Sequence, residues 1–164
     1  MDQNRYQPPR ANVDPRNREP GSIPKAVAVG AVIDIGGTIV GSTLVAMCYA
    51  IILGMQGLSS DAIAQALSNA DRWSLYGIVS MAIGTGMSVL GGYQCAVIAN
   101  RNTYLAPGIL SVVSVGSGAL MSEGQSALPE LLFFSALTVA AILGGASLHT
   151  RKLAEPPSRP AAKG

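Results

Sequence analysis

Asp34 is the residue of this chain whose type and position could support chemistry. It stands in the run Val-Ile-Asp-Ile-Gly, eight residues into an apolar stretch that begins at Ala26. If that stretch crosses a membrane, a charge within it costs at least ~2.5 kcal/mol on insertion scales, which makes Asp34 a candidate functional residue. Three interpretations are open. Asp34 binds a proton or cation during transport, makes a polar contact between helices, or reaches the membrane interface through a shift of its helix.

A carboxyl group in apolar surroundings needs hydrogen-bond partners, because an unpaired buried polar group is costly. The other apolar stretches contain no lysine, arginine or glutamate at a comparable depth, so we expect hydroxyl groups to be the partners. The candidates are Thr38, Ser80, Thr85, Ser88, Ser111, Ser114 and Thr138.

Sequence motifs for catalysis are missing. The chain has no GxxxxGK[ST] or GxGxxG loop for nucleotides, no HExxH motif and no CxxC pair. Its one histidine, His149, ends the last apolar stretch, where we expect a capping or surface role. No acid and base pair lies within the apolar stretches to support proton transfer. We therefore expect no enzyme activity, no cofactor and no bound metal.

The composition is that of an integral membrane protein. Of the 164 residues, 49% are hydrophobic and 12% are charged, against roughly 25% charged in soluble proteins. Thirteen of the twenty charged residues lie in residues 1–25 and 150–164. These values exclude a disordered protein and an ordinary soluble enzyme. The net charge of +2 is too small to indicate a nucleic-acid partner.

Four apolar stretches must position Asp34 and its partners. They cover residues 26–53, 75–99, 104–121 and 128–148, and each approaches or exceeds the ~20 residues that a membrane-spanning helix needs. The sequence thus predicts an all-α fold, an antiparallel bundle of four transmembrane helices over residues 26–149. The flanking segments 1–25 and 150–164 are rich in proline and charge, and we expect them to be disordered tails.

The distribution of positive charge predicts an orientation. If the N-terminus is cytoplasmic, ten of the eleven lysines and arginines fall on that side and Arg72 alone falls on the other. Because positive residues resist translocation, both termini are expected in the cytoplasm. The loop of residues 54–74 carries a mildly amphipathic segment that lies on the membrane surface or forms a solvated loop.

Small residues recur along the first two apolar stretches. Gly30, Gly37 and Gly41 share one face of the first, and Gly77, Gly84 and Ser88 lie on the second at a similar spacing. Small residues let membrane helices approach closely, so we expect these six to pack helices together. The matching spacing is also compatible with an inverted repeat, as in many secondary transporters.

The sequence from Gly91 to Arg101, followed by Tyr104 and Gly108, resembles a set of uncharacterised small bacterial inner-membrane proteins. In that set a GGYxxAxxA-R pattern joins two glycine-rich helices through a short basic loop. The resemblance covers about one fifth of the chain and implies an inner-membrane location and four helices, but no activity. A single acid in the first of four helices is also similar to small multidrug-resistance transporters, although this chain is longer and lacks their aromatic-rich chamber.

The expected function is a structural or accessory role in a membrane assembly. The expected partners are the lipid bilayer and either further copies of this chain or other membrane subunits. The alternative is a small proton- or cation-coupled transporter, or a channel-forming oligomer, that uses Asp34. A bundle of this size has little interior for a pathway, so transport would require assembly of several chains.

Overall fold

The computed structural model describes residues 21–100, 102–121 and 128–154. Most of the two expected disordered tails lies outside these residues. Within them every element is a helix, which confirms the all-α class. Three helices, Ile23–Met55, Leu75–Ala99 and Leu128–Lys152, are long and apolar enough to cross a membrane, and Leu105–Leu120 is a shorter apolar helix.

The first apolar stretch forms one continuous rod of three elements. These are α1 (Ile23–Ala31), the π-helical turn η2 (Val32–Gly36) and α2 (Gly37–Met55). Pro24 stands in the first turn of α1, where its missing N–H costs no helical hydrogen bond. The helix therefore begins at Ile23, three residues before the apolar stretch.

The remaining elements are α3 (Ser60–Ser68), α4 (Leu75–Ala99), α5 (Leu105–Met121) and α6 (Leu128–Ala154). The bounds of α4 coincide with the second apolar stretch. In contrast, α6 continues six residues beyond the expected end at Leu148, into the segment expected to be a disordered tail. Arg151 and Lys152 occupy its last turn, where positive side chains favour the carbonyl end of a helix dipole.

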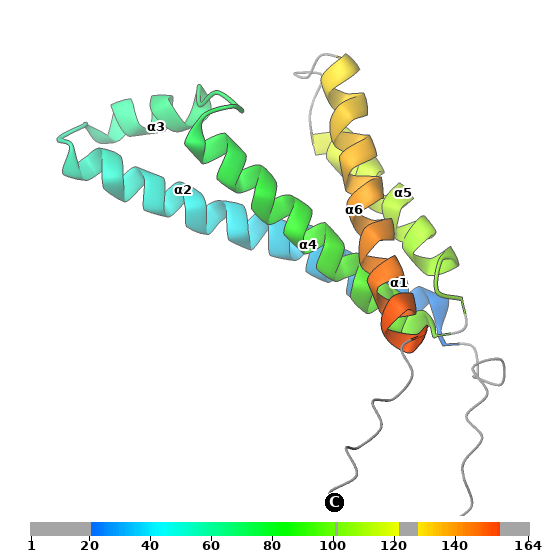
Figure 1. Ribbon diagram of the computed structural model, residues 1–164. Coiled ribbons are helices and arrows are strands. Elements are labelled where there is room, and N and C mark those ends of the chain that lie inside the picture. The colour runs from blue at the N-terminus through cyan, green and yellow to red at the C-terminus, as the bar shows by residue number, and fades with distance from the viewer. Residues whose placement is uncertain (1–20, 101, 122–127, 155–164) are drawn as a thin grey trace, which may run out of the picture.

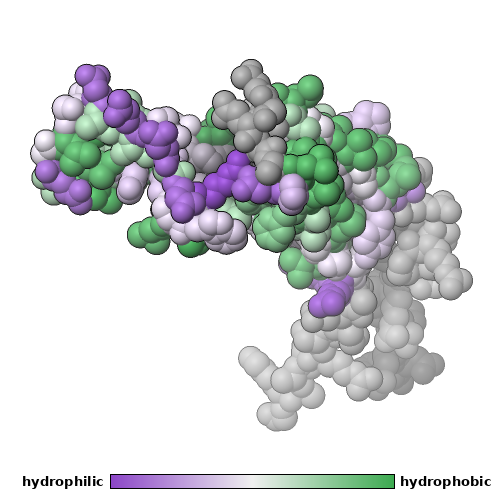
Figure 2. All heavy atoms as spheres, turned by 90° about the horizontal axis from the view of Figure 1, so that it is seen from above, coloured by the Kyte–Doolittle hydropathy of each residue, from purple (hydrophilic) through white to green (hydrophobic). Residues whose placement is uncertain are grey.

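The amphipathic segment of the loop between residues 54 and 74 forms the helix α3. The hydroxyl of Ser59 caps its start by accepting a hydrogen bond from the Ala62 N–H. α3 packs against the end of α2. Seen from this end of the molecule, hydrophilic residues form a band over α3 and toward the centre, with hydrophobic residues beside it (Figure 2).

Two arms diverge from a common base (Figure 1). α2, α3 and the first half of α4 form one arm, and α5 with the first half of α6 forms the other. At the base, α1 packs against α4 and α5, the second half of α4 packs against α5 and α6, and the described chain begins and ends there. α4 is the central helix, because it contacts α1, η2, α2, α5 and α6.

Alanine, cysteine and two larger aliphatic side chains form the core of the base. Its cluster of fully buried residues comprises Ala26, Cys95, Ala99, Ala106, Leu110 and Ile142. α4 and α6 approach backbone to backbone where Gly92 lies against Ile142 and Gly145 lies against Val89, and a β-carbon at either glycine would overlap that backbone. The base is thus the tightly packed end of the molecule.

Candidate functional site

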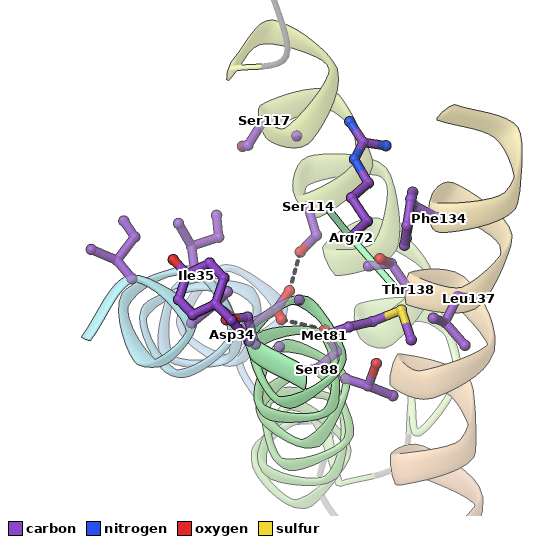
Figure 3. Close-up of a pocket in the computed structure, with 18 of the residues that line it drawn as sticks. Asp34, Ile35, Arg72, Met81, Ser88, Ser114, Ser117, Phe134, Leu137 and Thr138 are labelled. Atoms are coloured by element: carbon purple, nitrogen blue, oxygen red, sulfur yellow. Dashed lines mark hydrogen bonds between the residues drawn. The ribbon is translucent and has the colours of Figure 1, made fainter. Parts of the chain in front are cut away.

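Asp34 lies in the π-helical turn η2, and its side chain is 4% exposed. A π-turn inserts an extra residue into an α-helix and changes the direction in which its side chains point, and such turns are frequent at functional sites. Here the turn joins two α-helices and directs the carboxyl group toward α4 and α5 (Figure 3). Asp34 therefore lies between helices, in the first half of the rod Ile23–Met55.

Two serine hydroxyls donate hydrogen bonds to the Asp34 carboxyl group. The Ser88 hydroxyl, on α4, donates to Oδ1 over 2.6 Å, and the Ser114 hydroxyl, on α5, donates to Oδ2 (Figure 3). Each carboxyl oxygen thus has one donor, and the three residues come from three separate elements. Leaving a buried carboxyl oxygen without its hydrogen-bond donor costs about 1–3 kcal/mol.

Glycine residues let the rod approach α4 closely enough for this contact. A β-carbon at Gly30 would lie 2.8 Å from a Leu110 methyl group and 3.1 Å from Cys95 Cβ. On the opposite side, a β-carbon at Gly91 would lie 2.9 Å from the Gly30 carbonyl oxygen. All three distances are below ordinary van der Waals separations, so the helices meet at this depth only because neither residue has a side chain.

The other expected packing residues lie in different surroundings. A β-carbon at Gly37 would meet Met87, one at Gly41 would meet Ile83 of α4, and one at Gly84 would touch the Thr38 methyl group at 3.5 Å. Gly77 is different, because a β-carbon there would overlap the Arg72 carbonyl group in the turn that precedes α4. The absence of a side chain at Gly77 thus serves this turn rather than a contact between long helices.

A cavity of about 470 Å³ extends between the arms and includes Asp34 and both of its serine partners in its lining. Tyr76, Met81, Phe134 and Leu137 are among the apolar residues of its wall. Further hydroxyl groups line it at Thr38, Ser80, Thr85, Ser117 and Thr138. The Ser80 Oγ is buried and has no hydrogen-bond partner in the described part of the chain.

Arg72 and Glu130 form an ion pair that joins the two arms. The Arg72 guanidinium donates to Glu130 Oε2 over 2.6 Å, and it stacks over the Phe134 ring at 5.5 Å from the ring centre. Arg72 belongs to the turn before α4, whereas Glu130 and Phe134 belong to α6. Arg72 and Phe134 also line the cavity, on the side away from the base (Figure 3).

Asp34 makes no ion pair with a lysine, arginine or histidine in residues 21–100, 102–121 and 128–154. Over the same ranges no three histidine, cysteine or acidic side chains are grouped as metal ligands. His149 lies against the Tyr93 ring, with ring centres 5.7 Å apart, and is not part of the cavity wall. The chemistry that this arrangement can offer is the binding of a proton or a cation by one carboxyl group and its neighbouring hydroxyls.

The candidate hydroxyls separate into three groups. Ser88 and Ser114 bond to Asp34, and four others line the cavity without a hydrogen bond to Asp34: Thr38, Ser80, Thr85 and Thr138. Ser111 instead donates to the Pro107 carbonyl of its own helix over 2.9 Å. Sequence reasoning missed the π-turn, the Arg72–Glu130 pair and Gly91. A signal for the pair was available, because Arg72 precedes one apolar stretch and Glu130 lies at the start of another, on the same expected side of the membrane.

The chain matches no protein-family model, no curated protein and no solved structure.

Proposed function

We propose that the chain is a multi-pass protein of the bacterial inner membrane, with four spanning helices and both termini in the cytoplasm. The three long apolar helices support a membrane location. α5 has 17 residues and a length of about 26 Å, so it would cross a thin or locally thinned part of the bilayer. The concentration of lysine and arginine on the side of the termini supports the orientation.

We propose further that the protein is a small proton- or cation-coupled transporter or channel-forming oligomer in which Asp34 binds the ion. One observation carries the proposal. The buried Asp34 carboxyl group has hydroxyl partners but no cationic partner among the described residues, and it lines a cavity large enough for water and ions. A carboxylate within a membrane protein is costly without a positive partner, and a bound proton or cation removes that cost.

Ion flux into liposomes tests this function. Purified full-length protein is reconstituted with a pH-sensitive dye inside, and proton flux is recorded under an imposed pH gradient and under Na⁺ or K⁺ gradients. We expect flux from the wild type and a fall to the level of protein-free liposomes for Asp34→Asn, which keeps the shape of the side chain. Asp61→Asn, on the exposed face of α3, is the matched control and should transport normally. Equal flux in wild type and Asp34→Asn contradicts the proposal.

A structural or accessory role in a homo-oligomer or a larger membrane complex is the second candidate. The observation that favours it is that Asp34 joins η2, α4 and α5 through two hydrogen bonds. Under this role, wild-type liposomes carry no flux, and Asp34→Asn lowers the yield of folded protein or the mass of the purified assembly. Light scattering of the detergent-solubilised protein measures that mass. Neither candidate includes a catalytic step, so we propose no enzyme activity.

A further inference from the structure

The Arg72–Glu130 ion pair bridges the two arms at the end of the molecule where their helices lie apart. α4 begins in one arm and α6 begins in the other, and the helices converge only toward the base (Figure 1). The pair connects the residue three positions before α4 with the first turn of α6. The Arg72 guanidinium also lies over the Phe134 ring, which gives Arg72 a second contact with α6.

The turn that carries Arg72 is fixed to α4. The Asp71 side chain accepts a hydrogen bond from the Trp73 N–H over 3.0 Å, and the Ser74 hydroxyl caps α4 by accepting from the Gly77 N–H over 3.2 Å. Gly77 also lies directly against the Arg72 carbonyl group. The backbone of Arg72 is therefore held to the start of α4, and separation of the α4 arm from α6 would pull the Arg72 guanidinium away from Glu130.

The two ends of the cavity differ in how firmly they are closed. Toward the base, α4 and α6 touch through Gly92 and Gly145, and fully buried side chains fill the space. At the other end the arms are joined by an ion pair whose side chains are 47% and 49% exposed. Exposed ion pairs are weak, because water and salt screen them. The end at Arg72 is thus the one that can open without disrupting the core.

We propose that Arg72 and Glu130 form a gate that controls access to Asp34 from the end of the molecule opposite the base. The inference rests on the proposed function, because it assigns the regulation of the same ion site. When the pair is formed, α6 and the turn before α4 are held together across the cavity. When it separates, the arms move apart and water and ions reach the hydroxyls that line the way to Asp34.

Thiol accessibility tests the gate without measuring transport. Ser117 lines the cavity and donates to the Val113 carbonyl of its own helix, so Ser117→Cys places a thiol there without removing an Asp34 partner. The probe is made in the full chain with Cys48→Ser, since Cys48 is exposed and Cys95 is buried. The protein is held in lipid nanodiscs, and the rate of its reaction with iodoacetamide, a small neutral reagent, is measured.

We expect Glu130→Gln to increase the rate of reaction at the Ser117→Cys thiol about two- to fivefold, which is what loss of an exposed ion pair allows. Arg72→Glu and Glu130→Arg should each raise it, because they place like charges together, and the double exchange should restore the wild-type rate. High salt should accelerate the reaction only where an ion pair is present, in the wild type and in the double exchange. Ala64→Cys, on the exposed face of α3, is the control probe and should be insensitive to all of these changes.

The outcomes separate the gate from the ion site. If the Ser117→Cys thiol reacts at the same rate with and without the Arg72–Glu130 pair, the gate proposal is wrong. This holds even if ion flux still depends on Asp34. If the rate follows the pair and the double exchange restores it, the gate is supported. The gate proposal would then hold even if liposomes with the wild-type protein carried no ion flux. An absence of flux would contradict only the proposed transport function.

Discussion

Gly91 of α4 lies directly against Asp34. A β-carbon at position 91 would stand 3.0 Å from Asp34 Cβ and 2.9 Å from the Gly30 carbonyl oxygen. Both distances are too short for a methyl group, and one of the two groups is backbone that cannot rotate away. The position of the candidate ion site therefore depends on a residue that has no side chain and forms no bond to it.

Gly91→Ala should displace η2 from α4 and weaken the Asp34 hydrogen bonds. Inserting a methyl group into a packed contact costs about 1–3 kcal/mol, and we expect a loss of that size in the free energy of unfolding. The measurement is an SDS titration of purified protein in mild detergent, followed by circular dichroism.

Gly86→Ala is the matched control for Gly91→Ala. It lies on the same helix, and a β-carbon there would meet nothing within 4 Å. Because alanine favours a helix over glycine by up to about 1 kcal/mol, Gly86→Ala should be neutral or slightly stabilising. Equal stability of the two variants would contradict the close contact between Gly91 and η2.

Ser114→Ala should destabilise the protein more than Ser111→Ala. The first change leaves Asp34 Oδ2 without its donor inside the protein, at an expected cost of about 1–3 kcal/mol. The second removes a bond from Ser111 to a helix carbonyl one turn away, so no carboxyl oxygen loses a partner. Both serines lie on α5 and both lose one hydroxyl, so the same SDS titration compares them directly. A larger loss for Ser111→Ala would contradict the assignment of Ser114 to Asp34.

The fold could be predicted to the level of helix positions because apolar length is a strong signal. The stretch 75–99 has the bounds of α4, and the stretch 128–148 lies within α6. The divergence of the arms could not be predicted. Hydropathy records which residues avoid water, but it does not record the angle at which two apolar rods cross, since lipid and protein are equally apolar neighbours.

The partners of Asp34 could be predicted only as a class. Hydroxyls were expected because no cationic residue lies at a similar depth, and Ser88 and Ser114 belong to the expected group. Their selection depends on the π-turn, which rotates Asp34 relative to an ideal helix. The run Val-Ile-Asp-Ile-Gly has no residue that forces such a turn, and η2 packs against α4, a tertiary contact that hydropathy does not reveal.

Neighbouring glycines on α6 give a sharp test of the tight base. Gly145 lies against the Val89 carbonyl of α4, where a β-carbon would overlap backbone, whereas a β-carbon at Gly144 would meet nothing within 4 Å. Gly145→Ala should therefore separate α4 from α6 and reduce the yield of folded protein in size-exclusion chromatography. Gly144→Ala should give a wild-type yield, because it adds a methyl group to an open face and favours the helix. Equal yields for the two variants would mean that the base is loosely packed, and the cavity would then have two ends able to open rather than one.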